Sequence, residues 1–176
     1  YELSNELRKK LALFCNVRED AVIQSIDVGT IYDVPIKMLE EGLDKVVLNK
    51  LKLKSKPHKL DEWNSFLKKY KNPKGKVRIG LVGKYVELQD SYKSILEASI
   101  HAGAVNEVEV EIVSIHSEFL NQTNIEEQLK SLDGLIVAPG FGERGIEGKI
   151  SAINYVRENK IPFFGICLGM QMAVIE

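Results

Sequence analysis

The sequence predicts an α/β fold, with a doubly wound parallel sheet over residues 76–176 preceded by a smaller region of helix and strand. The first observation is that apolar, strand-length runs alternate with helix-length segments from Lys76 onward, as in parallel sheets covered by helices on both faces. The second is a change of composition over 55–75, where lysines, prolines and a glycine interrupt the pattern. We therefore expect two domain parts, 1–54 and 76–176, joined by a linker at 55–75.

The first part is expected to be mainly helical. Apolar residues recur there at intervals of three and four, which predicts an amphipathic helix over 2–14: Leu3, Leu7, Leu11 and Phe14. Further elements are expected as a strand at 21–26 and helices at 33–41, 43–48 and, within the linker, 60–67. The many lysines of the linker indicate a solvated surface rather than a nucleic-acid patch, because no groove-reading motif accompanies them.

The second part alternates regularly. Strands are expected at 77–83, 108–115, 135–138 and 161–166. Helices are expected at 91–104 with Asp90 as N-cap, and at 124–132, 149–159 and 168–176. Ligands bind at the carboxyl ends of the strands in such sheets, so the loops that follow residues 138 and 166 are the expected location of a site.

The composition argues against several kinds of partner. Of the 176 residues, 44% are apolar and 28% are charged, and the net charge of -1 gives no overall attraction to nucleic acid or to a membrane. No apolar run is long enough to span a bilayer. The two cysteines, Cys15 and Cys167, lie far apart and lack metal-ligand spacing, which indicates free thiols and a cytoplasmic location.

The most informative stretch is an apolar run that ends in Gly165-Ile166-Cys167-Leu168-Gly169 and leads directly into a helix. This is the Gly-x-nucleophile-x-Gly pattern of a sharp strand-to-helix turn, with cysteine in place of serine. A helix N-terminus favours a thiolate, and the Leu168 N–H would point at the oxygen of a carbonyl under attack. The alternative is a buried structural cysteine, but the two flanking glycines favour a nucleophile.

A glycine-rich loop over 138–149 is the second candidate motif. Four glycines in one loop at a strand end allow backbone N–H groups to approach a ligand closely. Gly140 is the natural second donor of an oxyanion hole shared with Leu168. The alternative is a connection without a ligand, which the neighbouring nucleophile pattern disfavours.

The segment Gly165-Ile166-Cys167-Leu168-Gly169-Met170-Gln171 resembles the nucleophile elbow of class I glutamine amidotransferases. Other stretches are similar to the CTP synthase family in particular: 13–17, 25–32, 83–94 and 140–148. The resemblance runs from end to end of the chain. It implies the C-terminal part of a P-loop-type synthetase domain, a linker, and the first half of a class I glutaminase domain, and hence a piece of a longer protein.

The resemblance implies a two-site ligase. One site hydrolyses glutamine through a thioester on Cys167 and releases ammonia, and the other uses ATP and Mg²⁺ to convert UTP to CTP with that ammonia. By similarity the residues that hold the glutamine and its oxyanion are Gly140, Leu168, Gly169, Met170 and Gln171. The resemblance also implies GTP as an allosteric activator near the Arg144 loop, and a homotetramer that can form filaments.

For the synthetase site the resemblance implies that Lys10 contacts the pyrimidine nucleotide, and that Ile26, Asp27 and Val28 line the ATP adenine. No metal ligand is expected in this segment. The residues alone would make Lys10 a solvated cation on a helix face.

Two departures from the family qualify these expectations. Pro139 stands where the family usually has glycine, and because proline has no N–H only Gly140 can donate there. The family's catalytic base, a histidine oriented by a glutamate, lies downstream of the elbow, whereas His58, His101 and His116 all precede it. We therefore expect this chain not to be active alone.

Two other functions remain open at this point. One is the glutaminase of another class I amidotransferase, or a related cysteine hydrolase, and the residues from Lys10 to Val28 argue against it. The other is a non-catalytic α/β domain that contributes only assembly or regulatory contacts.

Overall fold

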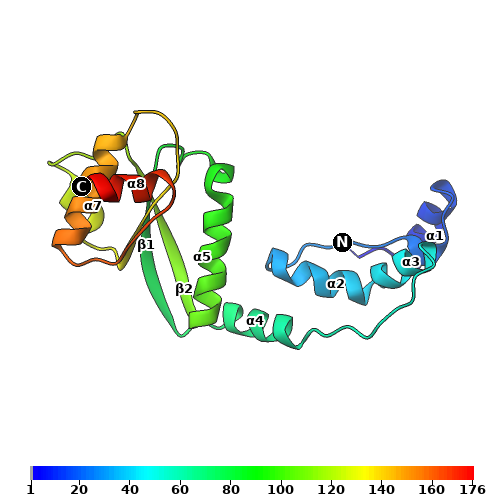
Figure 1. Ribbon diagram of the computed structural model, residues 1–176. Coiled ribbons are helices and arrows are strands. Elements are labelled where there is room, and N and C mark those ends of the chain that lie inside the picture. Colours follow the sequence, from blue (N-terminus) through cyan, green and yellow to red (C-terminus); the bar gives the residue numbers. More distant parts are fainter. Residues whose placement is uncertain (1) are drawn as a thin grey trace. The chain divides into compact units, whose positions relative to one another are not determined.

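The computed structural model describes residues 2–176, without the side chain of Gln89, and divides into two compact units (Figure 1). The first unit is Tyr1–Leu67 and the second is Lys68–Glu176. The division falls inside α4 (Asp61–Lys71), the helix of the expected linker. Each unit is described by itself below.

The first unit is helical, and its helices lie where they were predicted. Its α-helices are α1 (Asn5–Phe14), α2 (Val34–Glu40) and α3 (Leu43–Lys50). Ser4 caps α1 by accepting a hydrogen bond from the Leu7 N–H at 3.2 Å. Short 3₁₀ turns occur at Glu19–Ala21 and Ile31–Asp33.

The strand predicted at 21–26 is wrong. Residues 22–28 are irregular, and side chains bond to the backbone at two of these positions. Arg8 Nη1 donates to the Val22 carbonyl at 2.6 Å, and the Gln24 N–H donates to Glu41 Oε2 at 3.1 Å. A strand needs a partner to complete its hydrogen bonds, and within residues 2–176 none pairs with this stretch.

An aromatic cluster links α4 to the rest of the first unit. Tyr32 is buried and packs edge-on against Phe66, with ring centroids 5.1 Å apart, and against Trp63 at 6.1 Å. The Trp63 indole N–H donates to the Tyr32 carbonyl at 3.1 Å. The N-terminal half of α4 is therefore part of a packed structure.

The second unit contains the predicted parallel sheet. Its strands are β1 (Gly75–Gly83), β2 (Val108–His116), β3 (Gly134–Val137) and β4 (Phe163–Gly165). They are all parallel, in the order β2-β1-β3-β4. The register aligns Gly83 with His116, Val82 with Val137, and Val137 with Gly165, so all four strands end at one level. We call this level the carboxyl end of the sheet.

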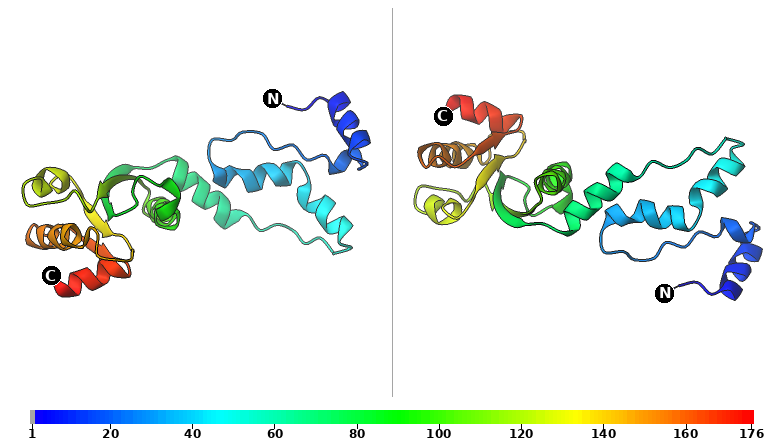
Figure 2. Two further views of the ribbon diagram at one scale, coloured as in Figure 1. Left: turned by 90° about the horizontal axis from the view of Figure 1, so that it is seen from above. Right: turned by 90° about the horizontal axis from the view of Figure 1, so that it is seen from below.

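Helices cover both faces of this sheet (Figure 2). On one face α5 (Lys93–Asn106) packs on β2, near Leu81 and Ile112. On the other lie α6 (Ile125–Leu129), α7 (Ile146–Glu158) and α8 (Leu168–Ile175), around Val82 and Val137. Leu81 is buried on one face and Val82 on the other, because successive side chains along a strand point to opposite faces. The doubly wound α/β fold is therefore confirmed.

Helix boundaries in this unit differ from the predicted ones; α7, for example, begins at Ile146 rather than at Lys149. Asp90 is not the N-cap of α5, because Gln89–Tyr92 form a 3₁₀ turn and Tyr92 precedes the helix. Helix α6 is shorter than expected, because Asn121 and Asn124 bond to the local backbone: the Asn121 N–H donates to Asn124 Oδ1 at 3.0 Å. Asparagine side chains compete with helical hydrogen bonding in this way.

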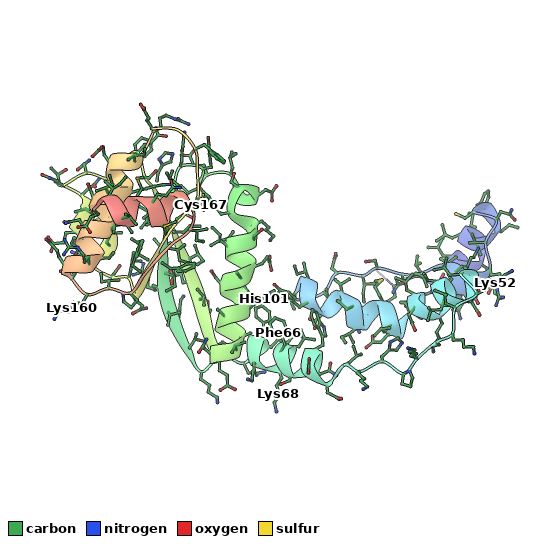
Figure 3. All side chains as sticks on the ribbon, in the orientation of Figure 1. Lys52, Phe66, Lys68, His101, Lys160 and Cys167 are labelled. Carbon is green, nitrogen blue, oxygen red and sulfur yellow. The ribbon has the colours of Figure 1, made fainter. Side chains whose placement is uncertain are left out.

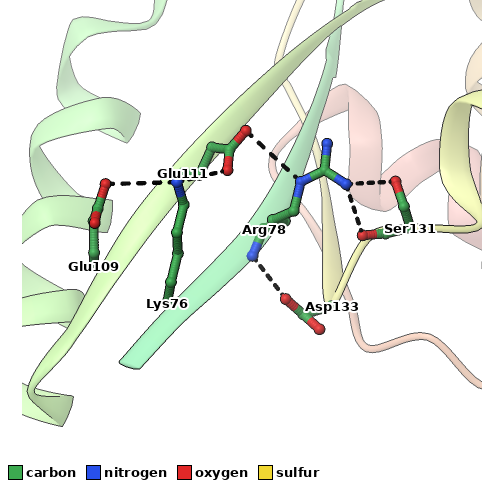
Figure 4. A network of polar contacts seen from close by, with 6 residues as sticks. All are labelled: Lys76, Arg78, Glu109, Glu111, Ser131 and Asp133. Carbon is green, nitrogen blue, oxygen red and sulfur yellow. Dashed lines mark hydrogen bonds and ion pairs between the residues drawn. The ribbon is translucent and has the colours of Figure 1, made fainter. Parts of the chain in front are cut away.

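The opposite, amino end of the sheet carries a network of half-exposed ion pairs (Figure 4). Lys76 Nζ lies 3.0 Å from Glu111 Oε2, and Arg78 Nε lies 3.7 Å from Glu111 Oε1. Arg78 Nη1 also donates to Ser131 Oγ at 2.7 Å, and the Arg78 N–H donates to Asp133 Oδ2 at 2.7 Å. These contacts tie β1 to β2 and to the turn before β3.

Candidate active site

Cys167 occupies the turn between β4 and α8 at the carboxyl end of the sheet (Figure 3). It is the N-cap residue of α8, it is exposed, and its backbone has φ 52° and ψ -107°. Glycine dominates this region of φ/ψ space, and a side chain held there costs about 1–3 kcal/mol. The expected strained strand-to-helix turn is therefore confirmed in its geometry.

The two flanking glycines allow α8 to approach the sheet. A Cβ on Gly169 would lie 2.2 Å from the Val137 carbonyl oxygen at the end of β3. A Cβ on Gly165 would lie 2.6 Å from the Met170 nitrogen in the first turn of α8. Any larger residue would push the helix, and with it Cys167, away from the strand ends. This confirms the predicted reason for the glycines, which is close backbone approach.

The glycine-rich loop follows β3 on the same end of the sheet. The Ala138 N–H donates to the Val82 carbonyl at 2.9 Å, which extends the sheet by one residue before the loop begins. Gly142 (φ 77°) and Gly145 (φ 76°) have left-handed backbone conformations that favour glycine. Gly140 lies beside the elbow, because a Cβ placed on it would contact Leu168 Cδ2 at 3.6 Å. The Gly140 backbone therefore lies beside the Leu168 side chain.

A buried lysine lies beneath this loop. Lys149, in the first turn of α7, is 1% exposed, and its Nζ donates to the Ala138 carbonyl at 2.9 Å. Burial lowers the pKa of Lys149 and the charge of Lys84 lowers it further, whereas the charge of Cys167 opposes both, so the net pKa lies below its ordinary value. A negative charge at Cys167 would thus favour the protonated form of Lys149.

The loop after β1 supports the glycine-rich loop from its other side. Lys84 Nζ donates to the Phe141 carbonyl at 3.3 Å. The Tyr92 hydroxyl oxygen accepts hydrogen bonds from the Lys84 and Tyr85 N–H groups at 3.1 and 3.2 Å, which holds the start of this loop in place. Tyr92 is itself buried, so the arrangement rests on the core.

The segment after β2 packs against the far end of the glycine-rich loop. Arg144 Nη1 lies 3.2 Å from Glu118 Oε1. A Cβ on Gly148 would lie 1.9 Å from the Ser117 carbonyl oxygen, so α7 can begin here only with a glycine at that position. Three loops at the carboxyl end of the sheet thus converge on the one that carries Gly140.

The predicted site residues fall into two groups. Gly140, Cys167 and Leu168 come together, and Gly169, Met170 and Gln171 follow in the first turn of α8, with Met170 and Gln171 exposed. The predicted nucleotide-binding residues lie in the first unit: Lys10, Ile26, Asp27 and Val28. Lys10 is exposed on α1, and the other three lie in the irregular stretch 22–28. Their role stays a prediction.

Neither histidine of the second unit, His101 or His116, stands beside Cys167 in a position to act as its base. His58 pairs with Asp44 in the first unit, with Nε2 2.9 Å from Oδ2, and His101 lies on α5. His116 ends β2, which is separated from β4 by β1 and β3, or about 14 Å at the usual strand spacing. Its ring stacks on Phe119, and its Nδ1 accepts from the Glu118 N–H at 3.3 Å.

Lys149 is the site residue that sequence reasoning missed. One signal was present in the sequence: Lys149 precedes Ala152, Ile153 and Val156 at the spacing of one helix face. All of these residues are buried in α7, so the periodicity already placed the lysine on the buried face. Lysine is seldom buried, so this spacing alone does not single Lys149 out as a site residue.

The fold and the site define an α/β protein with a cysteine elbow and a glycine-rich loop at the carboxyl end of a parallel sheet. The chain belongs to the class I glutamine amidotransferase family, whose model, "Glutamine amidotransferase class-I", matches residues 87–176. A second model, "CTP synthase N-terminus", matches residues 1–53. The second match argues against a free-standing glutaminase.

The relatives narrow the family further. A CTP synthase of Flavobacterium psychrophilum is 71% identical over 100% of this chain and 33% of its own length. The CTP synthase of Cytophaga hutchinsonii is 62% identical, again over 100% of this chain and 33% of its own length. The resemblance to the CTP synthase family is thereby confirmed. The chain spans about a third of the length of the curated relatives it matches.

A solved structure supports the same assignment. The glutaminase domain of Trypanosoma brucei CTPS with bound acivicin is 43% identical, with a TM-score of 0.51, over 56% of this chain and 39% of that one. Separately, within residues 2–176 no helix combines the length and apolar character that crossing a membrane requires.

Proposed function

We propose that this chain supplies the nucleophile and the oxyanion hole of a glutaminase that feeds ammonia to the synthesis of CTP from UTP. The observation that carries the proposal is the placement of Cys167, exposed and strained at the N-terminus of α8, with Gly140 and Leu168 beside it. The family and its CTP synthase relatives supply the substrate class.

In the proposed reaction the Cys167 thiolate adds to the amide carbon of glutamine. The carbonyl oxygen becomes an oxyanion, which the N–H groups of Gly140 and Leu168 stabilise. The C–N bond then breaks and the nitrogen takes up a proton and leaves as ammonia, so that a thioester remains on Cys167. Water hydrolyses the thioester to glutamate and restores the thiol.

The proton transfers need a general acid and base. His58, His101 and His116 all precede Cys167 in the sequence, whereas the family's base follows it, so we assign this role to a downstream histidine of the full-length enzyme. Within residues 2–176, no three His, Cys, Asp or Glu side chains gather as a possible metal site. By analogy with the family, we assign Mg²⁺ and most contacts to ATP to residues outside this segment.

For the synthetase site we propose that Lys10 contacts the pyrimidine nucleotide and that Ile26, Asp27 and Val28 border the adenine of ATP. The match of residues 1–53 to the CTP synthase N-terminus supports this assignment. GTP activation, a homotetramer that can form filaments, and a cytoplasmic location complete the proposal by analogy with the family.

The test uses a full-length synthase that contains this segment. Replacing Cys167 with Ala should reduce glutamine-dependent CTP formation by about 10⁴-fold and leave ammonia-dependent formation unchanged, because only the first route needs the thioester. Replacing the other exposed cysteine, Cys15→Ala, is the matched control and should preserve both activities. Equal loss of both activities in the Cys167 variant would contradict the two-site proposal. A wild-type enzyme that consumes glutamine but does not aminate UTP would indicate another amidotransferase.

A further inference from the structure

The lysine beneath the glycine-rich loop is unfavourable for stability in three ways. Lys149 is 1% exposed, and a buried cation loses its hydration. It lies in the first turn of α7, where the helix dipole is positive and disfavours a cation. Lys84, a second cation, acts on it electrostatically in the same unfavourable direction. If the side chain at position 149 served only to pack the core, these costs would disfavour a lysine there.

The interactions of Lys149 do not offset these costs. Its Nζ donates to a neutral acceptor, the Ala138 carbonyl, at 2.9 Å. Among the described residues it forms no ion pair with a carboxylate, although a buried lysine is usually paired. A methionine has nearly the same length and would fill the same space without a charge, so packing alone does not explain a lysine here.

The groups around the Lys149 ammonium explain better why a lysine occurs at this position. Nζ lies 3.5 Å from the position that a Cβ on Gly140 would take, and Gly140 is the neighbour of Leu168. The Ala138 carbonyl that it holds is two residues before Gly140, with the rigid ring of Pro139 between them. Among the described residues, a negative charge at Cys167 is what would favour the protonated form of Lys149.

We propose that Lys149 is a positioning residue of the glutaminase site. Its ammonium fixes the Ala138 carbonyl, and through it the peptide that presents the Gly140 N–H to the substrate oxygen. Its positive charge also favours the anionic thiolate and the oxyanion that form at Cys167. This inference rests on the proposed function, and it assigns to the buried lysine a role in the rate of the chemical step rather than in the fold.

The experiment compares Lys149→Met with the wild type in a full-length synthase that contains this segment. We expect kcat for glutamine hydrolysis to fall about tenfold with KM changed less than twofold, because the loss concerns the transition state; removing an oxyanion donor outright costs about 10²–10³-fold. Ammonia-dependent CTP formation should be unchanged, and the melting temperature should be equal or higher. Lys149→Arg, which keeps the cation, should recover most of the lost kcat.

A second readout separates an electrostatic role from a purely structural one. The rate at which an electrophilic glutamine analogue inactivates the enzyme should rise with pH, and in Lys149→Met this rise should move to higher pH. Lys130→Met, at the exposed end of α6, is the matched control and should leave the profile unchanged.

The outcomes are distinct. Wild-type kcat and an unmoved pH profile in Lys149→Met would overturn the inference. So would an unfolded or less stable Met variant that loses both activities, since the lysine would then be structural. If the wild-type enzyme itself shows no glutaminase activity that depends on Cys167, the proposed function fails instead, and that result is visible without the Lys149 variants.

Discussion

The two ends of the same four-stranded sheet differ in how their charged side chains are paired and in whether their backbone is strained. At the amino end, Lys76, Arg78 and Glu111 form ion pairs that are half exposed to water, and the Arg78 guanidinium also bonds to Ser131. At the carboxyl end, Cys167 has a strained backbone and Lys149 is a buried cation without a carboxylate partner among the described residues. At the amino end the charged side chains are paired, whereas the carboxyl end has a strained backbone and a charge without an ion-pair partner among the described residues.

The difference shows that the unfavourable interactions of this unit are concentrated at the carboxyl end of the sheet. The same strands β1 and β3 connect the two ends, so their hydrogen bonding and packing can support an unfavourable arrangement at one of them. A mutation at the amino end should therefore change stability slightly and activity not at all. A mutation at the carboxyl end should change activity strongly, and some should even raise stability.

The largest expected effect is the selectivity of thiol labelling. Cys15 and Cys167 are both exposed and free, but Cys15 lies at the C-terminus of α1 and Cys167 at the N-terminus of α8. The helix dipole favours an anion only at the second position, and the proposed oxyanion hole would bind the reagent there. An electrophilic glutamine analogue should label Cys167 at least about 100-fold faster than Cys15, by peptide mapping of the full-length enzyme. Equal labelling rates at Cys15 and Cys167 would contradict the prediction that only Cys167 is activated.

The next effect concerns glycines at the two ends. Gly169→Ala places a Cβ 2.2 Å from the Val137 carbonyl, so the helix must move, and we expect a loss of about 3 kcal/mol in the free energy of unfolding. Gly75→Ala, at the amino end, meets only Val108 Cγ1 at 3.7 Å, an ordinary contact. It should be neutral within about 0.5 kcal/mol. Thermal melting of the two variants measures the contrast, and similar losses would contradict it.

Removing the buried charge should change stability in a pH-dependent way. The pKa of Lys149 is lower in the folded protein than in the unfolded chain, so the unfolded chain binds more protons between the two values. The lysine therefore destabilises the protein below its folded pKa, and this penalty is relieved as pH rises toward about 10.5. Lys149→Met should be more stable than the wild type at pH 7, and the difference should shrink as pH is raised. A difference that is constant or grows with pH would show that burial is not the cause.

The smallest expected effect is at the amino end. The hydrogen bond from Lys76 holds the pKa of Glu111 below its ordinary value. Such a carboxylate contributes stability above its unfolded pKa and loses it as pH falls through the folded pKa. Glu111→Gln should lower the melting temperature slightly at pH 7, less in high salt, and not at acid pH. Glutaminase activity should be unaffected. A clear loss of activity would contradict the expectation that mutations at the amino end change only stability.

Much of this unit could be predicted from the sequence because its elements have strong local signals. The alternation of strands and helices, and the Gly165 to Gly169 pattern, gave the parallel sheet and the elbow. The strand expected at 21–26 failed because an apolar run does not reveal whether a partner strand exists, and here the side chains of Arg8 and Glu41 hold the backbone instead. Lys149 was missed because the acceptor of its ammonium, a backbone carbonyl, has no signature in the sequence.

The conformation of Cys167 has a consequence for how this segment would change over evolutionary time. A backbone with φ 52° and ψ -107° is unfavourable for every amino acid that has a side chain, and in the proposed function the reactivity of the thiol offsets this cost. A descendant released from glutamine hydrolysis would gain stability from Cys167→Gly, more than from Cys167→Ala. Glycine at this position, in a chain that keeps Gly165 and Gly169, would therefore mark a lineage that has abandoned the reaction and kept the fold.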